Sequence, residues 1–179
     1  MNDYIALLRG INVGKAKRIA MDALCALVER LGFEDIRAVL NSGNVVFRGK
    51  KAAEWMIADR LRESLELRHG FTAMTVILTA NDLDTIVREN PLSRLTDDGS
   101  KFQVGFVMDP KVLSAARQIA AEDWGKDEIA VTTRAIYTFT PGGISKSPML
   151  KALEKAAKDS ITFRNWATVL KIQAEARGR

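Results

Sequence analysis

The residues best suited to chemistry lie in the segment LLRGINVGK, residues 7–15, where an apolar run stops at Arg9 and a glycine-punctuated loop begins. Gly10 and Gly14 allow the backbone to adopt positive φ or to approach a ligand closely. Amide and positively charged side chains share this loop with the glycines: Asn12, Lys15, Lys17 and Arg18. Backbone N–H groups and cations gathered after a strand and before a helix predict a site for an anion.

This loop is similar in kind to a phosphate-binding Walker loop, but its spacing excludes nucleotide hydrolysis. Three residues separate Gly10 from Gly14 where a Walker loop needs four, and Ala16 stands where a magnesium-binding Ser or Thr belongs. Two interpretations stay open at this point. The loop binds an anion, or it only connects a strand to a helix.

Cysteine and histidine usage excludes the common metal sites. Cys25 and His69 are the only residues of their kinds, so neither a cysteine cage nor a two-histidine zinc motif can form. We therefore predict no structural metal, no cofactor and no catalytic constellation. No apolar run approaches the roughly 20 residues of a membrane span, and MNDYIALL lacks the features of a secretory signal, so we expect a soluble, cytoplasmic protein without membrane contact.

The net charge of +5 is concentrated at the two ends of the sequence. Residues 1–20 contain four Lys or Arg and one Asp, whereas residues 145–179 contain eight Lys or Arg and three acidic residues. A basic surface of this kind is often only solvated. The alternative is that both ends converge in the fold and form one positive site for nucleic acid or a phosphorylated metabolite.

Hydrophobic periodicity predicts an α+β order in the first half of the chain. Residues 4–9, 36–40, 44–48 and 73–78 have strand character, and residues 21–31 and 51–68 have helical spacing. The turn signal at residues 41–43 makes the second and third strands a hairpin. This βαββαβ order is typical of a ferredoxin-like unit with an antiparallel sheet.

The second half repeats the order. After a polar helix near residues 80–90, strands are expected at 102–108, 127–132, 135–140 and 161–163, and helices at 110–123, from Pro148, and from about Asn165. We predict two tandem ferredoxin-like units, residues 1–84 and residues 85–179, the second with an extra C-terminal helix.

Periodicity also predicts which side chains form the core. Helical stripes predict that Cys25 is buried and inert and that Trp55 faces the core. Alternation places Phe102, Val104, Phe106 and Met108 on one core-facing side of a strand, which favours packing over RNA stacking. The spacing of Trp166 with Val169, Leu170 and Gln173 likewise favours core packing, although Trp166 could stack on a base.

Four segments can be read together: LLRGINVG, VLNSGNVVF, the pair Ser145-Lys146, and FRNWATVLK. In this order and spacing the chain resembles the bacterial family named domain of unknown function 1697. The resemblance implies a two-part α+β protein built from ferredoxin-like plaits and implies no reaction. The family's second glycine, proline and threonine are replaced here by Lys15, Ala20 and Phe163.

The motif positions of the family, together with the charged residues beside them, supply the candidate ligand-binding residues. These are Arg9, Asn12, Lys15, Asn41, Ser42, Asn44, Lys146, Arg164, Asn165 and Trp166. The two arginines would pair with phosphate, the lysines would add charge, and the asparagines would donate hydrogen bonds. Asn41, Ser42 and Asn44 are equally typical of a hairpin turn.

The sequence therefore predicts a protein that binds an anionic ligand, a phosphate-bearing small molecule or a nucleic acid, in a basic groove between the two units. Two alternatives stay open. One is an enzyme without a cofactor that acts on a small phosphorylated or carboxylated substrate. The other is a scaffold for protein interactions.

Overall fold

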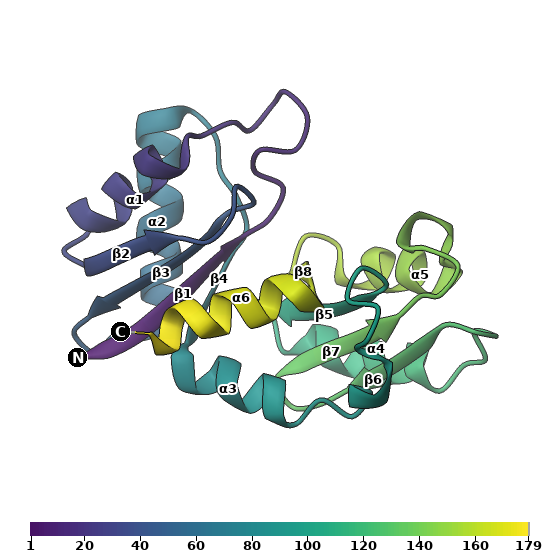
Figure 1. Cartoon of the computed structure of the whole chain (residues 1–179). Helices are drawn as coiled ribbons and strands as arrows, with labels where there is room; N and C mark the ends of the chain where they lie inside the picture. The colour runs from purple at the N-terminus through teal and green to yellow at the C-terminus, as the bar shows by residue number, and fades with distance from the viewer. Residues whose placement is uncertain (179) are drawn as a thin grey trace. The chain divides into compact units, whose positions relative to one another are not determined.

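The computed structural model describes residues 1–178, which divide into two compact units (Figure 1). The first unit comprises residues 1–84 and the C-terminal segment from Lys171, and the second comprises residues 85–170. The sequence-based interpretation assigned that C-terminal segment to the second unit. The predicted domain boundaries otherwise stay a prediction.

The first unit is a four-stranded antiparallel sheet with two helices against it (Figure 1). Its elements are β1 (Asn2–Leu8), α1 (Met21–Arg30), β2 (Glu34–Ala38), β3 (Asn44–Gly49), α2 (Glu54–His69) and β4 (Thr75–Thr79). The strands lie in the order β2-β3-β1-β4, so the first strand pairs with the third and the fourth.

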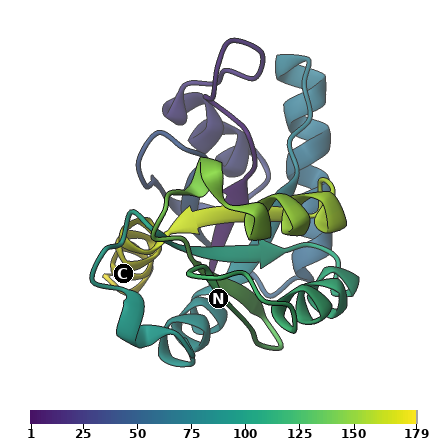
Figure 2. The same cartoon turned by 90° about the vertical axis from the view of Figure 1, so that its right-hand side faces the viewer.

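The second unit repeats this plan of an antiparallel sheet with helices against it (Figure 2). Its main elements are β5 (Phe102–Val107), α4 (Lys111–Ala120), β6 (Glu128–Val131), β7 (Ala135–Phe139), α5 (Pro148–Ala157) and β8 (Ile161–Asn165). The strands lie in the order β6-β7-β5-β8. Short 3-10 turns lie at Ser93–Leu95 and Ile144–Lys146. The chain passes between the units within α3 (Ala80–Arg88) and again within α6 (Trp166–Arg177). The α+β class and the two repeated units are confirmed.

Alternating side chains of the first sheet build the core beneath α1 and α2. Tyr4, Ala6 and Leu8 of β1 are all about 1% exposed or less and pack with both helices. Three aromatic rings form the end of this core, with centroid distances of 5.8 Å between Tyr4 and Phe47 and 4.7 Å between Phe33 and Phe47. Such ring pairs stabilise a core beyond the area they bury.

The core of the second unit lies between its sheet and the helices α4 and α5. Gly105 of β5 is required there because an added Cβ would lie 2.8 Å from both Ile161 and Phe163. The start of α5 follows the prediction: the Ser147 hydroxyl accepts a hydrogen bond from the Leu150 N–H at 3.0 Å, and Pro148 occupies the first turn.

Three predicted core side chains are exposed instead. Trp55 is 68% exposed, because at 100° per residue it lies roughly 100° from the centre of the buried face of α2 and Ile57 takes its place. Met108 is 49% exposed because β5 ends one residue earlier, at Val107. Leu170 is 40% exposed, whereas its neighbour Val169 is fully buried.

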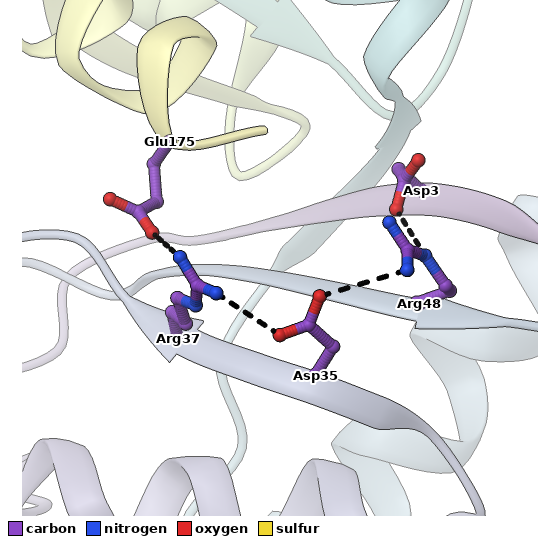
Figure 3. Close-up of polar contacts among 5 residues, drawn as sticks. All are labelled: Asp3, Asp35, Arg37, Arg48 and Glu175. Atoms are coloured by element: carbon purple, nitrogen blue, oxygen red, sulfur yellow. Dashed lines mark hydrogen bonds and ion pairs between the residues drawn. The ribbon is translucent and has the colours of Figure 1, made fainter. Parts of the chain in front are cut away.

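The end of α6 is fastened to the first unit by ion pairs (Figure 3). Arg37 of β2 bonds Glu175 at 2.9 Å and Asp35 at 3.4 Å, Asp35 lies 3.9 Å from Arg48, and Arg48 bonds Asp3 at 3.0 Å. The chain of charges thus joins three strands to the C-terminal helix.

Asp84 also attaches α6 to the first unit through hydrogen bonds. Its carboxylate accepts hydrogen bonds from Gln173 at 2.7 Å and Arg177 at 2.8 Å. Each exposed pair contributes little alone, so the attachment depends on their sum. Within residues 1–178, no helix combines the length and the apolar character that crossing a membrane requires.

Candidate functional site

The basic loop, defined here as residues 9–20, leaves the sheet of the first unit at the end of β1 (Figure 1). The Leu8 N–H donates to the Gly43 carbonyl at 2.8 Å, and the Arg9 N–H donates to the Met74 carbonyl at 2.8 Å. Arg9 itself is half-buried. The first residue of the loop is therefore held on both sides, which fixes where the rest of the loop begins.

Asn12 closes the loop at its base. Its Nδ2 donates to the carbonyls of Ile19 at 2.9 Å and Asn41 at 3.1 Å, and its Oδ1 accepts from the Ile19 N–H at 3.0 Å. Ile11 and Ile19 on either side are buried in the core, at 1% and 5% exposure. Asn12 also has a left-handed backbone with φ of 57°, which asparagine tolerates better than most residues. The amide thus positions the loop, and both of its N–H bonds are occupied.

The tip of the loop carries its cations into solvent. Lys15, Lys17 and Arg18 are exposed, as is Val13 at 73%. The Arg18 Nε donates to the Gly14 carbonyl at 2.9 Å, which leaves the other guanidinium N–H groups accessible. Among the described residues, no ion pair joins Lys15, Lys17 or Arg18 to a carboxylate. The tip is therefore a concentration of uncompensated positive charge on an ordered base.

The hairpin turn at residues 39–44 supports this loop from one side. Asn44 is fully buried, and its Nδ2 donates to the Val39 carbonyl at 2.9 Å and to Ser42 Oγ at 3.0 Å. Gly43 has φ of +76°, and a Cβ there would lie 2.8 Å from Ile11. The structure thus brings Asn12, Asn41, Ser42 and Asn44 together, with Asn44 and Ser42 bonded inside the turn.

Arg164 lies on β8 of the second unit, where it is only 9% exposed. Its Nη1 donates to Thr162 Oγ1 and to the Phe163 carbonyl, both at 2.8 Å. Burial lowers the pKa of the Arg164 guanidinium to about 10, because desolvation disfavours the charged form. Hydrogen bonds to its own strand therefore occupy part of the guanidinium group that was expected to bind phosphate.

The neighbouring candidates in the second unit are also engaged in local structure. The Asn165 Oδ1 accepts a hydrogen bond from the Thr168 N–H at 2.8 Å, which caps the start of α6. Trp166 is half-buried and meets Phe102 edge to face, with a centroid distance of 5.4 Å. Lys146 is exposed in the short turn before α5. The convergence of the two basic ends of the chain stays a prediction.

Cys25 is half-buried rather than buried, because it lies at the margin of the apolar face of α1. It lines a cavity of about 460 Å³, and Asp22 and Glu29 are also part of the lining. Burial, followed by the charge of Asp22, raises the pKa of the Cys25 thiol, which keeps it protonated. Within residues 1–178, no group of His, Cys, Asp and Glu side chains is arranged to hold a metal ion.

Lys17 and Arg18, which complete the loop tip, were noted in the sequence for their charge but left out of the ten candidate ligand-binding residues. Lys17 and Arg18 are exposed beside Lys15, and the signal for them was present in the run KAKR, residues 15–18. That run contains only small and basic residues and sits between two buried isoleucines.

Comparison with known proteins supports the fold and the family. The chain is similar to a solved structure of the conserved bacterial protein SP0830 from Streptococcus pneumoniae, with a TM-score of 0.81 and 22% identity over 98% of each chain. No curated protein is similar enough to match the chain. The family model described as "Protein of unknown function (DUF1697)" matches residues 1–137. By this match over most of its length, the chain belongs to the DUF1697 family.

Proposed function

We propose that the protein binds a phosphate-bearing ligand, in the first place a nucleic acid, through the tip of the basic loop. One observation carries the proposal: Lys15, Lys17 and Arg18 are exposed together without an acidic partner among the described residues. Exposed cations without partners are free to replace the counterions of a polyanion, and the release of those counterions drives binding.

The ordered base of the loop supports this proposal. Asn12 closes the loop with three hydrogen bonds, so the backbone that carries the three cations is fixed at its base before any ligand arrives. A charged segment that is already ordered loses less conformational entropy on binding. In this proposal Asn12, Asn44 and Ser42 act as positioning residues and make no direct contact with the ligand.

The exposure of the tip favours an extended ligand. Three cations on a loop that stands out from the sheet can follow successive phosphates of a single strand, whereas a small metabolite gains most from enclosing walls. The exposed Val13 adds an apolar surface beside the charges. A phosphorylated small molecule is the alternative outcome of the test below.

The test is binding of the full chain to single-stranded RNA and DNA at several salt concentrations. The triple variant Lys15→Ala, Lys17→Ala, Arg18→Ala should reduce the slope of log K against log salt by about 2, since each lost contact to a single strand contributes about 0.7. A matched control removes three exposed lysines of the second unit: Lys111→Ala, Lys126→Ala and Lys155→Ala. The control should change the slope by much less.

Three results would contradict the proposal. The first is the absence of salt-sensitive binding by the wild-type chain to either nucleic acid. The second is an equal effect of the two triple variants, which would indicate a nonspecific effect of net charge. The third is binding only to phosphorylated metabolites, which would mean that the ligand is an anion but not a nucleic acid.

We also infer that each unit is a ferredoxin-like plait. The element order βαββαβ and a sheet in which the first strand lies between the third and the fourth support this assignment in both units. The inference matters for the site because the loop after the first strand then begins at the same end of the sheet as the hairpin turn, as the Leu8 to Gly43 hydrogen bond requires.

A further inference from the structure

A second basic feature of the first unit lies at the opposite end of β1 from the basic loop. A cavity of about 290 Å³ opens where α1 ends, β2 begins and β3 passes into α2. Its lining includes Leu31, Phe33, Glu34, Lys50, Lys51 and Arg60. β1 has seven residues, so the two features are separated by about 20 Å along the strand.

Arg60 is fixed at the wall of this cavity. Its Nη2 donates to the Leu31 carbonyl at 2.9 Å, and Leu31 is the C-terminal cap of α1. A cation is favoured at this end of a helix because the helix dipole is negative there. This is the one hydrogen bond that the Arg60 side chain makes within residues 1–178, so most of the five N–H groups of the guanidinium are accessible to a ligand.

The segment that carries the two lysines is also held in place. The Tyr4 hydroxyl accepts a hydrogen bond from the Ala52 N–H at 2.9 Å and lies 3.4 Å from the Lys50 carbonyl. Phe33 closes the cavity from inside, and it fits only because Gly49 has no side chain: a Cβ there would lie 2.4 Å from the Phe33 ring. The wall of the cavity that Phe33 forms is therefore fixed by core packing.

The charge of the lining is unbalanced. Lys50, Lys51 and Arg60 face a single lining carboxylate, Glu34, and no ion pair joins any of these four residues to a partner among the described residues. Cations in such a concave site attract a ligand that carries more than one negative charge. Leu31 and Phe33 add apolar surface, which a bare ion could not use.

We propose that this cavity is a binding site for a small phosphate monoester, with Arg60 and Lys51 on the phosphate and the organic group toward Leu31 and Phe33. The doubly charged phosphate matches the excess of cations, and the guanidinium presents its N–H groups in a fork that fits two phosphate oxygens. The site is separate from the nucleic-acid surface and independent of it, because it shares no residue with the basic loop.

Phenyl phosphate is the probe for this site, with phenol and inorganic phosphate as comparison ligands. Binding to the full chain is measured by calorimetry at low salt and by shifts in an amide NMR spectrum. Phenyl phosphate should bind more tightly than either comparison ligand. Lys51→Glu and Arg60→Gln should each weaken its binding about tenfold or more. Arg60→Gln retains a side-chain donor for the Leu31 carbonyl, so it separates loss of charge from loss of fold.

Lys17→Glu in the basic loop is the matched control, because it makes the same change of charge at the other end of β1. It should leave the affinity for phenyl phosphate unchanged while it weakens nucleic-acid binding. No binding of phenyl phosphate by the wild type would overturn the inference. Equal affinity for phenol, or equal effects of Lys17→Glu and Lys51→Glu, would also overturn it without affecting the proposal for the loop.

Discussion

Replacing Asn12 tests whether one side chain holds the basic loop closed. Asn12→Ala removes three hydrogen bonds of 2.9, 3.0 and 3.1 Å, each contributing about 0.5–1 kcal/mol at this partly exposed position. Alanine also has no side-chain hydrogen bond that could support the left-handed backbone at φ of 57°, and this costs about 1 kcal/mol more. We expect the free energy of unfolding to fall by about 3 kcal/mol.

Asn12→Gly is the matched comparison, because it removes the same hydrogen bonds but accepts the left-handed backbone. Its loss should be smaller than that of Asn12→Ala by about 1 kcal/mol. Urea denaturation measures both values, and limited trypsin digestion at the loop cations reports its opening. A loss below about 0.5 kcal/mol for Asn12→Ala would refute the reasoning, as would unchanged digestion of the loop.

Three further predictions concern the core and the titratable groups. Gly105→Ala should destabilise the second unit by about 1–3 kcal/mol in denaturant, because the new Cβ would lie 2.8 Å from Ile161 and Phe163; an unchanged midpoint would contradict this packing. Cys25 should react with a thiol reagent more slowly than a free cysteine near neutral pH, because its raised pKa favours the thiol; equal rates would contradict it. Burial raises the pKa of Tyr137 to about 12, so the stability it contributes is fully present below pH 10 and is lost between about pH 10 and 12. Tyr137→Phe should remove that part of the pH dependence of unfolding, and an identical pH profile would count against it.

Most of the fold could be predicted from local pattern. The predicted strands and helices correspond to those of the structure, because each element has its own periodicity and its own boundary residues. Ser147 and Pro148 predicted the start of α5, and the Asn-Ser-Gly turn predicted the hairpin of β2 and β3. These signals are local, so one sequence was sufficient to recognise them.

Two of the core predictions were wrong because a single residue's angle on a helix decided whether its side chain was buried. Trp55 and Cys25 each lie at the margin of an apolar stripe, where a rotation of one residue changes a core position into a surface position. Hydrophobic residue type was a poor guide there. Large apolar side chains often remain partly exposed in folded proteins.

The candidate site could be predicted only as a set of residue types. The glycines, Asn12 and the cations of the basic loop were visible in the sequence, but the closing hydrogen bonds to Ile19 and Asn41 depend on tertiary structure. The cavity with Lys51 and Arg60 was not foreseen for the same reason. Its residues are distributed over separate segments, and only the Lys50-Lys51 pair left a local signal.

The return of the chain to the first unit after residue 170 has a consequence for the order of folding during synthesis. Arg37 and Asp84 find their partners on α6 only at Gln173, Glu175 and Arg177. All three residues follow residue 170, where the second unit ends, so a ribosome adds them only after the whole second unit. The first unit is translated first, but it obtains the last of its contacts only after the second unit has been made. Its folding is therefore completed second, although domains generally fold in the order in which they are synthesised.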